Sequence, residues 1–309
     1  MSFSFDSTCD DVVSGVDLSG KTAVVTGAYG GLGKETVRAL ASKGAKVIAV
    51  GRNQQRLDET VSELTALTAN ENISAVVMDL ADLSSVKSAS ETIVGLCPQI
   101  DILINNAGIM ACPLDRTAQG LEMQIGVNHV SHFLMTSLLL PALKAAASAR
   151  VIALSSVAHK FSDVMYDDLN WDKTEYDRMK AYGSAKSANA VFAVEFNRLY
   201  GAEGITANAV HPGLILTELG RHFTAEDSAA MSSEGMQLKT IEQGAATSVW
   251  AATSPELEGK GGLYLEDCQI GEALGHTNPL VGYCDYIMDA EAGKNLWQQT
   301  EQLIDGLSF

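Results

Sequence analysis

The feature that most constrains the fold is a regular alternation of short apolar runs with longer amphipathic segments. The apolar runs are rich in Val, Ile and Leu, and they lie at residues 22–26, 46–50, 74–78, 101–104, 151–154, 205–210 and 262–265. Helical patterns separate them, at residues 33–42, 54–67, 84–94, 120–146 and from 182 onward. Strands that are apolar along their whole length are typical of a parallel sheet with helices on both faces. We therefore predict a single α/β domain built on a doubly wound parallel sheet.

The composition excludes several classes of partner. The chain of 309 residues is 46% hydrophobic and 19% charged, and its formal net charge is −17. Such acidity argues against nucleic acids and anionic membrane surfaces as partners. No apolar run reaches the length of a membrane span, and the acidic start lacks the features of a signal peptide. The five scattered cysteines have no metal-binding or redox spacing. We expect a cytoplasmic protein with reduced thiols and no metal.

A glycine-rich turn joins the first strand to the first helix. Residues 26–33 read Thr-Gly-Ala-Tyr-Gly-Gly-Leu-Gly. Glycines permit a tight turn and let backbone amides approach a pyrophosphate at the N-terminus of a helix. Two spacings fit, either Gly27 with Gly31 and Gly33 or a set that includes Gly30, and the turn alone leaves both open.

Further polar and glycine-containing segments follow three of the later strands. They are residues 105–108, 155–156 and 211–217. Ligands of open α/β sheets bind at the carboxyl ends of the strands, where these segments lie. The small residues at 107 and 108 leave space for a ribose.

Two tyrosines lie four residues before a lysine, Tyr176 before Lys180 and Tyr182 before Lys186. This spacing places phenol and ammonium on one face of a helix. A nearby cation favours the phenolate, whose ordinary pKa near 10 is too high for a base at neutral pH. The surroundings of Tyr176 are charged at nearly every position, which predicts a surface tyrosine. Tyr182 opens an apolar helical run with small neighbours, so we predict that it is the working phenol.

Together these segments resemble the non-extended branch of the short-chain dehydrogenase/reductase family, across about residues 19–270. Residues 181–189 and 208–213 are most similar to its retinol-dehydrogenase and WW-domain-oxidoreductase subgroup. The resemblance implies a Rossmann-type fold and four catalytic residues, Asn128, Ser156, Tyr182 and Lys186.

The resemblance also implies a role for each of the four. Tyr182 would exchange the proton of the substrate hydroxyl, and Lys186 would lower the pKa of Tyr182 and bind the nicotinamide ribose. Ser156 would hold the substrate oxygen, with Ser155 as the less favoured choice that faces the sheet. Asn128 would hold a water that links Lys186 to solvent, although an asparagine in mid-helix can also merely bend the helix.

The same resemblance implies the cofactor-binding residues. These are Gly27, Tyr29, Gly31, Leu32, Gly33, Arg52, Asp79, Leu80, Asn106, Ala107, Gly108, Tyr182, Lys186, Pro212, Gly213, Ile215 and Thr217. An acidic residue at the end of the second strand binds the ribose of NAD, whereas arginine suits the 2′-phosphate of NADP. Residues 49–53 contain Arg52 and no carboxylate, and Arg56 follows one turn later. NADP is therefore the expected cofactor and NAD the less favoured one.

Residues 214–240 are expected to form a substrate lid. Their apolar side chains are Leu214, Leu216, Leu219, Phe223, Met231, Met236 and Leu238, interrupted by Gly220 and Gly235. Adaptable side chains suit an apolar ligand and glycines suit a lid. Further apolar wall is expected from Met110, Cys112, Phe161, Met165 and Trp171. The expected substrate is a lipophilic secondary alcohol or ketone, steroid-like or aromatic.

Several alternatives stay open. The leading hypothesis is an NADP-linked alcohol dehydrogenase or carbonyl reductase, and the second is a reductase of carbon–carbon double bonds. The third is a cofactor-binding sensor without turnover, against which the four intact residues argue. Residues 1–18 form a lead-in, and residues 276–309 form an extension whose helix caps the fold or contacts a partner. A homodimer or a homotetramer is expected. His129, His132 and His159 are expected to be core or surface histidines, because they lack metal-ligand spacing.

Overall fold

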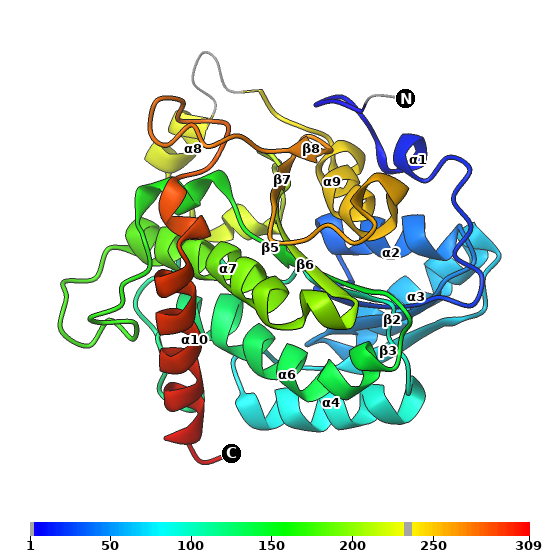
Figure 1. Cartoon of the computed structure of the whole chain (residues 1–309), viewed down its shortest axis with the longest axis horizontal. Helices are drawn as coiled ribbons and strands as arrows, with labels where there is room; N and C mark the ends of the chain where they lie inside the picture. The colour runs from blue at the N-terminus through cyan, green and yellow to red at the C-terminus, as the bar shows by residue number, and fades with distance from the viewer. Residues whose placement is uncertain (1–2, 232–236) are drawn as a thin grey trace.

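The computed structural model describes residues 3–231 and 237–309 and is built around one eight-stranded sheet (Figure 1). Its strands are β1 (Thr22–Thr26), β2 (Lys46–Gly51), β3 (Ile73–Val77), β4 (Ile102–Asn105), β5 (Ala149–Leu154), β6 (Ile205–His211), β7 (Tyr264–Glu266) and β8 (Gln269–Ile270). The order is β3-β2-β1-β4-β5-β6-β7-β8. All neighbouring pairs are parallel except β7 and β8. The predicted doubly wound sheet is confirmed, and each predicted strand lies within two residues of β1 to β7.

Helices alternate with these strands along the chain. The α-helices are α1 (Cys9–Val12), α2 (Gly31–Ala41), α3 (Gln54–Thr68), α4 (Leu83–Leu96), α5 (Met123–Ile125), α6 (Ser131–Lys144), α7 (Arg178–Tyr200), α8 (Ala225–Met231), α9 (Ile241–Thr253) and α10 (Ala290–Asp305). Shorter helical turns are η1 (Gly126–Val130), η2 (Val157–Phe161), η3 (Gly201–Glu203), η4 (Glu218–His222), η5 (Pro255–Leu257) and η6 (Asp285–Met288). Within the described residues, none of these helices combines the length and the apolar composition needed to cross a bilayer.

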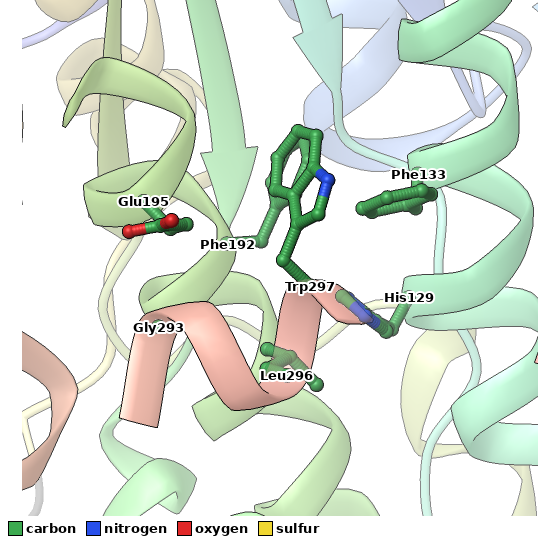
Figure 2. Close-up of a pocket in the computed structure, with 7 residues that line it drawn as sticks. All are labelled: His129, Phe133, Phe192, Glu195, Gly293, Leu296 and Trp297. Carbon is green, nitrogen blue, oxygen red and sulfur yellow. The ribbon is translucent and has the colours of Figure 1, made fainter. Parts of the chain in front are cut away.

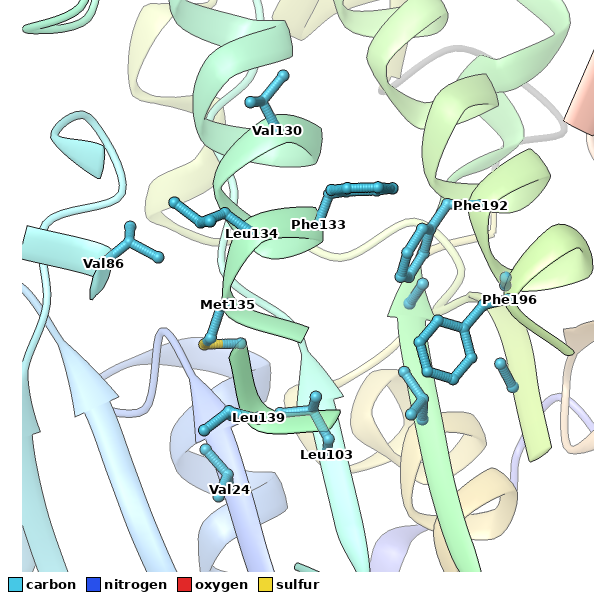
Figure 3. Packing of buried hydrophobic residues seen from close by; sticks show 14 of the residues in the cluster. Val24, Val86, Leu103, Val130, Phe133, Leu134, Met135, Leu139, Phe192 and Phe196 are labelled. Carbon is cyan, nitrogen blue, oxygen red and sulfur yellow. The ribbon is translucent and has the colours of Figure 1, made fainter. Parts of the chain in front are cut away.

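Two hydrophobic cores lie on opposite faces of the sheet. Successive residues of a strand point to opposite faces, so Val24 belongs to the core under α4, α6 and α7, and Val25 to the core under α2, α3 and α9. Figure 3 shows the first core, where Leu139 lies near Val24, and Phe133 of α6 faces Phe192 of α7. Since both faces are covered, the carboxyl ends of the strands are left to bind ligands.

Three helices differ from the sequence-based expectation. The predicted helical region 120–146 is confirmed as one unbroken run of α5, η1 and α6, but its η1 turn is a π-helix, which was not predicted. Helix α7 begins at Arg178 rather than at Tyr182, since the Asp177 side chain caps the backbone N–H groups of Met179 and Lys180. Helix α9 was not predicted at all, because it is buried around most of its surface and has little amphipathic periodicity.

The C-terminal helix α10 caps α6 and α7 of its own chain (Figure 1). Its Trp297 packs edge-on against Phe133, with ring centroids 4.7 Å apart, and stacks on Phe192 at 6.0 Å (Figure 2). Leu296 is almost fully buried in the same core. The sequence left open whether this helix caps the fold or contacts a partner. In this structure it caps the fold of its own chain.

Leu296→Ala should lower the free energy of unfolding by about 2–5 kcal/mol, because it removes buried methyl groups and leaves a cavity. Chemical denaturation of the purified protein measures this change. The exposed Gln298 on the same helix is the control, and Gln298→Ala should change the free energy of unfolding by less than about 0.5 kcal/mol. Equal effects of the two substitutions would show that α10 is not part of the cooperative core.

Candidate active site

Three glycines in the turn between β1 and α2 are required by its geometry. Gly27 and Gly31 have φ angles of +69° and +49°. Residues other than glycine are strained at such angles. A Cβ on Gly33 would lie 2.2 Å from the carbonyl oxygen of Gly27. Gly30 has an extended φ of −167°, and a Cβ there would make an ordinary contact at 3.6 Å with Arg56. The structure therefore selects the spacing of Gly27, Gly31 and Gly33, which leaves the helix N-terminus open to a phosphate.

Hydrogen bonds join this turn to the end of β4. Asn106 Nδ2 donates to the carbonyl oxygen of Thr26 at 2.6 Å. The Thr26 hydroxyl accepts the backbone N–H groups of Asn106 and Ala107, each at 2.9 Å. The strand order reverses between β1 and β4, and a ligand crevice forms at such a point in open α/β sheets. Asn106, Ala107 and Gly108 therefore lie at the point where the strand order reverses, and their part in cofactor binding stays a prediction.

Ser156, Tyr182 and Lys186 meet at the carboxyl end of β5. The Ser156 side chain lies close enough to the Tyr182 phenol to lower its pKa, and Lys186 Nζ lies 5.7 Å from the centroid of the Tyr182 ring. A Cβ on Gly183 would lie 2.7 Å from a carbonyl oxygen of η2, so glycine lets α7 approach the turn that follows Ser156. The Ser155 hydroxyl donates instead to the carbonyl oxygen of Lys186 at 2.8 Å. Ser156 is thus the serine that lies beside the phenol.

Asn128 lies on the other side of Lys186, in the π-turn η1. Its Oδ1 accepts the backbone N–H of Ile109 at 2.8 Å, and its Nδ2 donates to the Ile109 carbonyl at 3.0 Å. A Cβ on Gly108 would lie 3.1 Å from Asn128 Oδ1 and 3.5 Å from Lys186 Nζ, so the three residues converge. Because Ile109 occupies both ends of the Asn128 amide, this side chain holds the loop after β4, and its expected role in holding a water stays a prediction.

Burial dominates the pKa values of the central pair. It raises the pKa of the Tyr182 phenol well above its ordinary value, and the Ser156 side chain opposes this shift. It lowers the pKa of Lys186 from 10.5 to about 8. Lys186 Nζ donates to the carbonyl of Leu154 at 2.9 Å. Within the chain itself, Lys186 therefore does not produce the lowered pKa of Tyr182 that the resemblance implied.

Two arginines lie at the end of β2, at the expected adenosine side of the crevice. Arg52 is exposed and makes no hydrogen bond or ion pair within the described residues. Arg56 lies over the ring of Tyr29, 4.5 Å from its centroid, and pairs with Glu218 of η4 at 3.2 Å. Gly51 accommodates Tyr29, because a Cβ there would lie 2.5 Å from its ring. Both guanidinium groups are thus available at the surface, one free and one in an exposed ion pair.

Asp79 and Leu80, expected to border the adenine, follow β3. Asp79 is half-buried, and its carboxylate accepts the backbone N–H of Ala81 at 2.9 Å. Leu80 is buried, and its carbonyl oxygen accepts the hydroxyl of Ser131 in α6 at 2.6 Å. The two residues therefore form a fixed turn beside the end of β2.

The segment after β6 crosses the glycine turn. Gly213 follows directly after Pro212 and has a φ of +95°. This conformation redirects the chain. A Cβ on Gly31 would lie 3.4 Å from Thr217 Cγ2, and one on Gly244 would lie 2.6 Å from Ile215 and 2.9 Å from Leu32. Residues 212–217 thus lie against the N-terminal part of α2, and their part in binding a pyrophosphate stays a prediction.

The two ends of the expected lid are joined. Leu214 pairs with Leu238 in an isolated parallel bridge, and Lys239 N donates to the Leu214 carbonyl at 2.8 Å. The Lys239 ammonium is buried against Asp267 at 2.5 Å. Within the segment, Leu216 is exposed. Gly235 and Met236 lie outside the described residues, so their part in the lid stays a prediction.

Tyr176 is not the surface tyrosine that the sequence predicted. It is half-buried, and its hydroxyl donates to Glu122 Oε1 at 2.9 Å and contacts the carbonyl of Cys112 at 3.2 Å. Burial and the carboxylate of Glu122 raise the pKa of its phenol. The charged residues around it are exposed as expected, but the ring folds back against Trp171, 5.5 Å away. The role of Tyr176 is therefore structural.

The residues expected to form an apolar wall divide into two groups. Cys112 and Trp171 are buried, and Met110 and Met165 are half-buried. The Phe161 side chain is 51% exposed, although its Cβ approaches Gly183 next to Tyr182. Phe161 is consequently the exposed member of this set, and its Cβ lies beside Gly183, the residue after Tyr182.

The sequence did not reveal the roles of Thr26 and His132. His132 Nδ1 lies 3.0 Å from the Asn128 carbonyl oxygen, and its Nε2 lies 2.9 Å from the Thr26 hydroxyl. Because a carbonyl only accepts, Nδ1 carries the proton and Nε2 accepts from Thr26. The four-residue spacing of Asn128 and His132 was the available signal, but a π-helix was not anticipated. Within the described chain, no group of three or more His, Cys, Asp or Glu residues is arranged to hold a metal ion.

Lys186→Met should raise the free energy of unfolding at pH 7 by about 1–2 kcal/mol, since the cost of burying the charge exceeds the lost hydrogen bond. The pKa of Lys186 is lower in the folded protein, so the charged group destabilises it fully below about pH 8. As pH rises toward 10.5, the native protein has released this proton while the unfolded chain retains it, and the gain should shrink. Denaturation at neutral and alkaline pH measures both effects.

Lys180→Met serves as the control for this prediction, because Lys180 lies on α7 but is exposed. Its free energy of unfolding should change by less than about 0.5 kcal/mol at either pH. A destabilised Lys186→Met protein at pH 7 would contradict the account of Lys186.

Comparison with known proteins agrees with this geometry. The profile of the short chain dehydrogenase family matches residues 21–228. Human retinol dehydrogenase 13 is 36% identical over 292 residues, which cover 93% of this chain and 85% of that protein. A Streptomyces lividans protein named "Probable oxidoreductase" is 42% identical over 294 residues, 92% of this chain and 97% of its own length.

Among solved structures, that of an uncharacterised protein from Mycobacterium paratuberculosis has a TM-score of 0.74 at 31% identity. The match covers 97% of this chain and 98% of that one. The family profile and the relatives cover nearly all of the segments that build the site. The chain therefore belongs to the short-chain dehydrogenase family, near its retinol dehydrogenases, and is an NAD(P)-dependent oxidoreductase.

Proposed function

We propose that this enzyme transfers a hydride between NADP(H) and a lipophilic secondary alcohol or ketone. The observation that carries the proposal is the convergence of Asn128, Ser156, Tyr182 and Lys186 beside the crevice between β1 and β4. A bound nicotinamide supplies or takes up the hydride, and the four residues supply proton transfer and orientation.

In the direction of reduction, Tyr182 donates its phenolic proton to the carbonyl oxygen that becomes the hydroxyl. Ser156 donates a hydrogen bond to the same oxygen and so fixes its position beside the phenol. The charged Lys186 stabilises the phenolate that forms, and a proton from solvent restores the phenol. In oxidation each proton moves in the reverse direction.

The choice of NADP rests on the two guanidinium groups at the end of β2. Arg52 is free and exposed, and Arg56 needs only to leave an exposed ion pair with Glu218 to bind a phosphate. An exposed pair of this kind contributes little to stability, whereas a charge-assisted hydrogen bond to phosphate is strong.

The proposal of a lipophilic substrate rests on the segment after β6 and on Phe161. Leu216 and Phe161 are exposed large apolar side chains of this chain, and each belongs to a segment that borders the glycine turn or Tyr182. The lid, the homo-oligomer and the cytoplasmic location remain predictions. A panel of lipophilic ketones, alcohols and enones, followed by the absorbance of the reduced cofactor, identifies the substrate class.

Tyr182→Phe should reduce kcat by about a thousandfold or more, because the substituted ring has no proton to transfer. The dissociation constant of NADPH, measured by fluorescence titration, should change by less than about threefold. Tyr176→Phe is the matched control, with an unchanged kcat and a free energy of unfolding lower by about 1 kcal/mol. Turnover retained by Tyr182→Phe would disprove the proposed role.

Arg52→Asp should shift the cofactor preference from NADP toward NAD, because the substitution replaces a phosphate partner with an acceptor for a ribose hydroxyl. The loss in NADPH affinity should correspond to about 1.5–3 kcal/mol. Titration calorimetry with both cofactors measures it, and the exposed Lys180→Met protein should bind both as the unmodified enzyme does. Equal affinities of the unmodified enzyme for NADP and NAD would contradict the assignment.

A further inference from the structure

Two buried histidines contact the peptide group that follows Ser156. His159 Nδ1 lies 2.7 Å from the Ser156 carbonyl oxygen. The N–H of Val157, which belongs to the same peptide group, donates to His211 Nδ1 at 3.2 Å. Both side chains are almost fully buried. One peptide plane is therefore held on its two opposite sides by two imidazole rings.

The hydrogen bonds determine the tautomer of each ring. The Ser156 carbonyl can only accept, so His159 carries its proton on Nδ1, and its Nε2 accepts the backbone N–H of Cys284 at 3.2 Å. His211 Nδ1 accepts from Val157 and also from the backbone N–H of Gly213 at 3.4 Å, so its proton lies on Nε2. Burial lowers the pKa of both rings, to about 4 for His159 and about 3 for His211. Both rings are neutral near pH 7.

Each ring also connects the Ser156 turn to a second element. Through Gly213, His211 reaches the segment that crosses the glycine turn. Through Cys284, His159 reaches the chain just before η6. The neighbouring Lys160 reinforces this second connection, because its ammonium donates to the carbonyls of Asn278 and Val281 at 2.6 and 2.5 Å. Residues 212–217, which cross the glycine turn, are here called the cofactor segment. The C-terminal extension and this cofactor segment thus meet at Ser156.

We propose that His159 and His211 are positioning residues that orient Ser156 by clamping the Ser156–Val157 peptide between the cofactor segment and the C-terminal extension. The proposal rests on the proposed function of Ser156. A hydroxyl contributes to catalysis only when it is directed at the reacting oxygen, and small displacements of positioning groups cost much of the rate. The Ser156 hydroxyl accepts the backbone N–H of Ala158 at 3.1 Å, so a displacement of the turn that this peptide begins would shift the hydroxyl relative to Tyr182.

Histidine ring NMR of the uniformly ¹⁵N-labelled full-length protein tests the clamp without any substrate. We expect neutral rings at pH 7, with the proton on Nδ1 of His159 and on Nε2 of His211. The opposite tautomer or a charged ring at either position would overturn the proposal.

Kinetics with a ketone found in the panel tests the consequence. His159→Leu and His211→Leu should each lower kcat by about tenfold or more, with the NADPH dissociation constant changed by less than about threefold. His159→Asn keeps an N–H donor near Nδ1, and His211→Asn keeps an oxygen acceptor there. Each should recover at least about a third of the kcat, which a general loss of stability would not explain. Leucine variants with unchanged kcat, or losses that asparagine does not reverse, would contradict the clamp.

Two further variants separate this proposal from its basis. Lys160→Met removes bonds to the C-terminal extension but none to the Ser156 peptide, so its kcat should stay within about threefold of the unmodified enzyme. A fall as large as that of the leucine variants would assign the effect to the extension alone and overturn the clamp. Ser156→Ala should abolish turnover. If it does not, the proposed function of Ser156 fails, whereas a clamp that fails leaves the Ser156→Ala result unchanged.

Discussion

The hydrogen bonds that fasten α7 to the end of β5 determine where the Tyr182 phenol lies relative to Ser155 and Ser156. The Leu154 carbonyl accepts both Lys186 Nζ and Asn189 Nδ2 at 2.9 Å. In return, the Ser155 hydroxyl donates to the carbonyl of Lys186. These bonds fix the rotation of α7 about its axis, and Gly183 lets it lie close to η2. Tyr182 can therefore meet only one of the two serines.

This arrangement has a cost in stability that the proposed function explains. Lys186 is a buried cation without a carboxylate partner, and Tyr182 is a buried phenol whose ionisation burial disfavours. A ligand that brings polar groups next to Lys186 would favour its charged form and, through it, the phenolate. Under the proposed function, Tyr182 and Lys186 serve catalysis rather than folding, which is where such a cost in stability is expected.

Local patterns in the sequence predicted most of the sheet, and the resemblance to the short-chain dehydrogenases implied the four residues that converge. Apolar runs located β1 to β7, and the spacing of Tyr182 and Lys186 placed both groups on one face of α7. Helix α9 was not predicted because it is buried around most of its surface, and the burial of Tyr176 was not predicted because its neighbours in the sequence are charged. These two failures have one cause, since in each case contacts from distant parts of the chain outweighed the local pattern.

Long-range hydrogen bonds also could not be predicted from the sequence. No spacing relates His159 to Cys284, or His132 to Thr26, because the fold alone brings these residues together. His129, His132 and His159 were expected to be core or surface residues. All three are buried in the core, but the sequence did not show which groups their two nitrogens would bind.

The destination of the hydride tests the central claim most directly. The enzyme is supplied with NADPH that carries deuterium at the transferred position, and with a lipophilic enone whose carbonyl and double bond are both reducible. Mass spectrometry and NMR then locate the label in the product. A carbonyl reductase places one deuterium on the carbinol carbon, which is the result that this account predicts. Deuterium on the carbon β to an intact carbonyl, or no deuterium in any product of the panel, would contradict it.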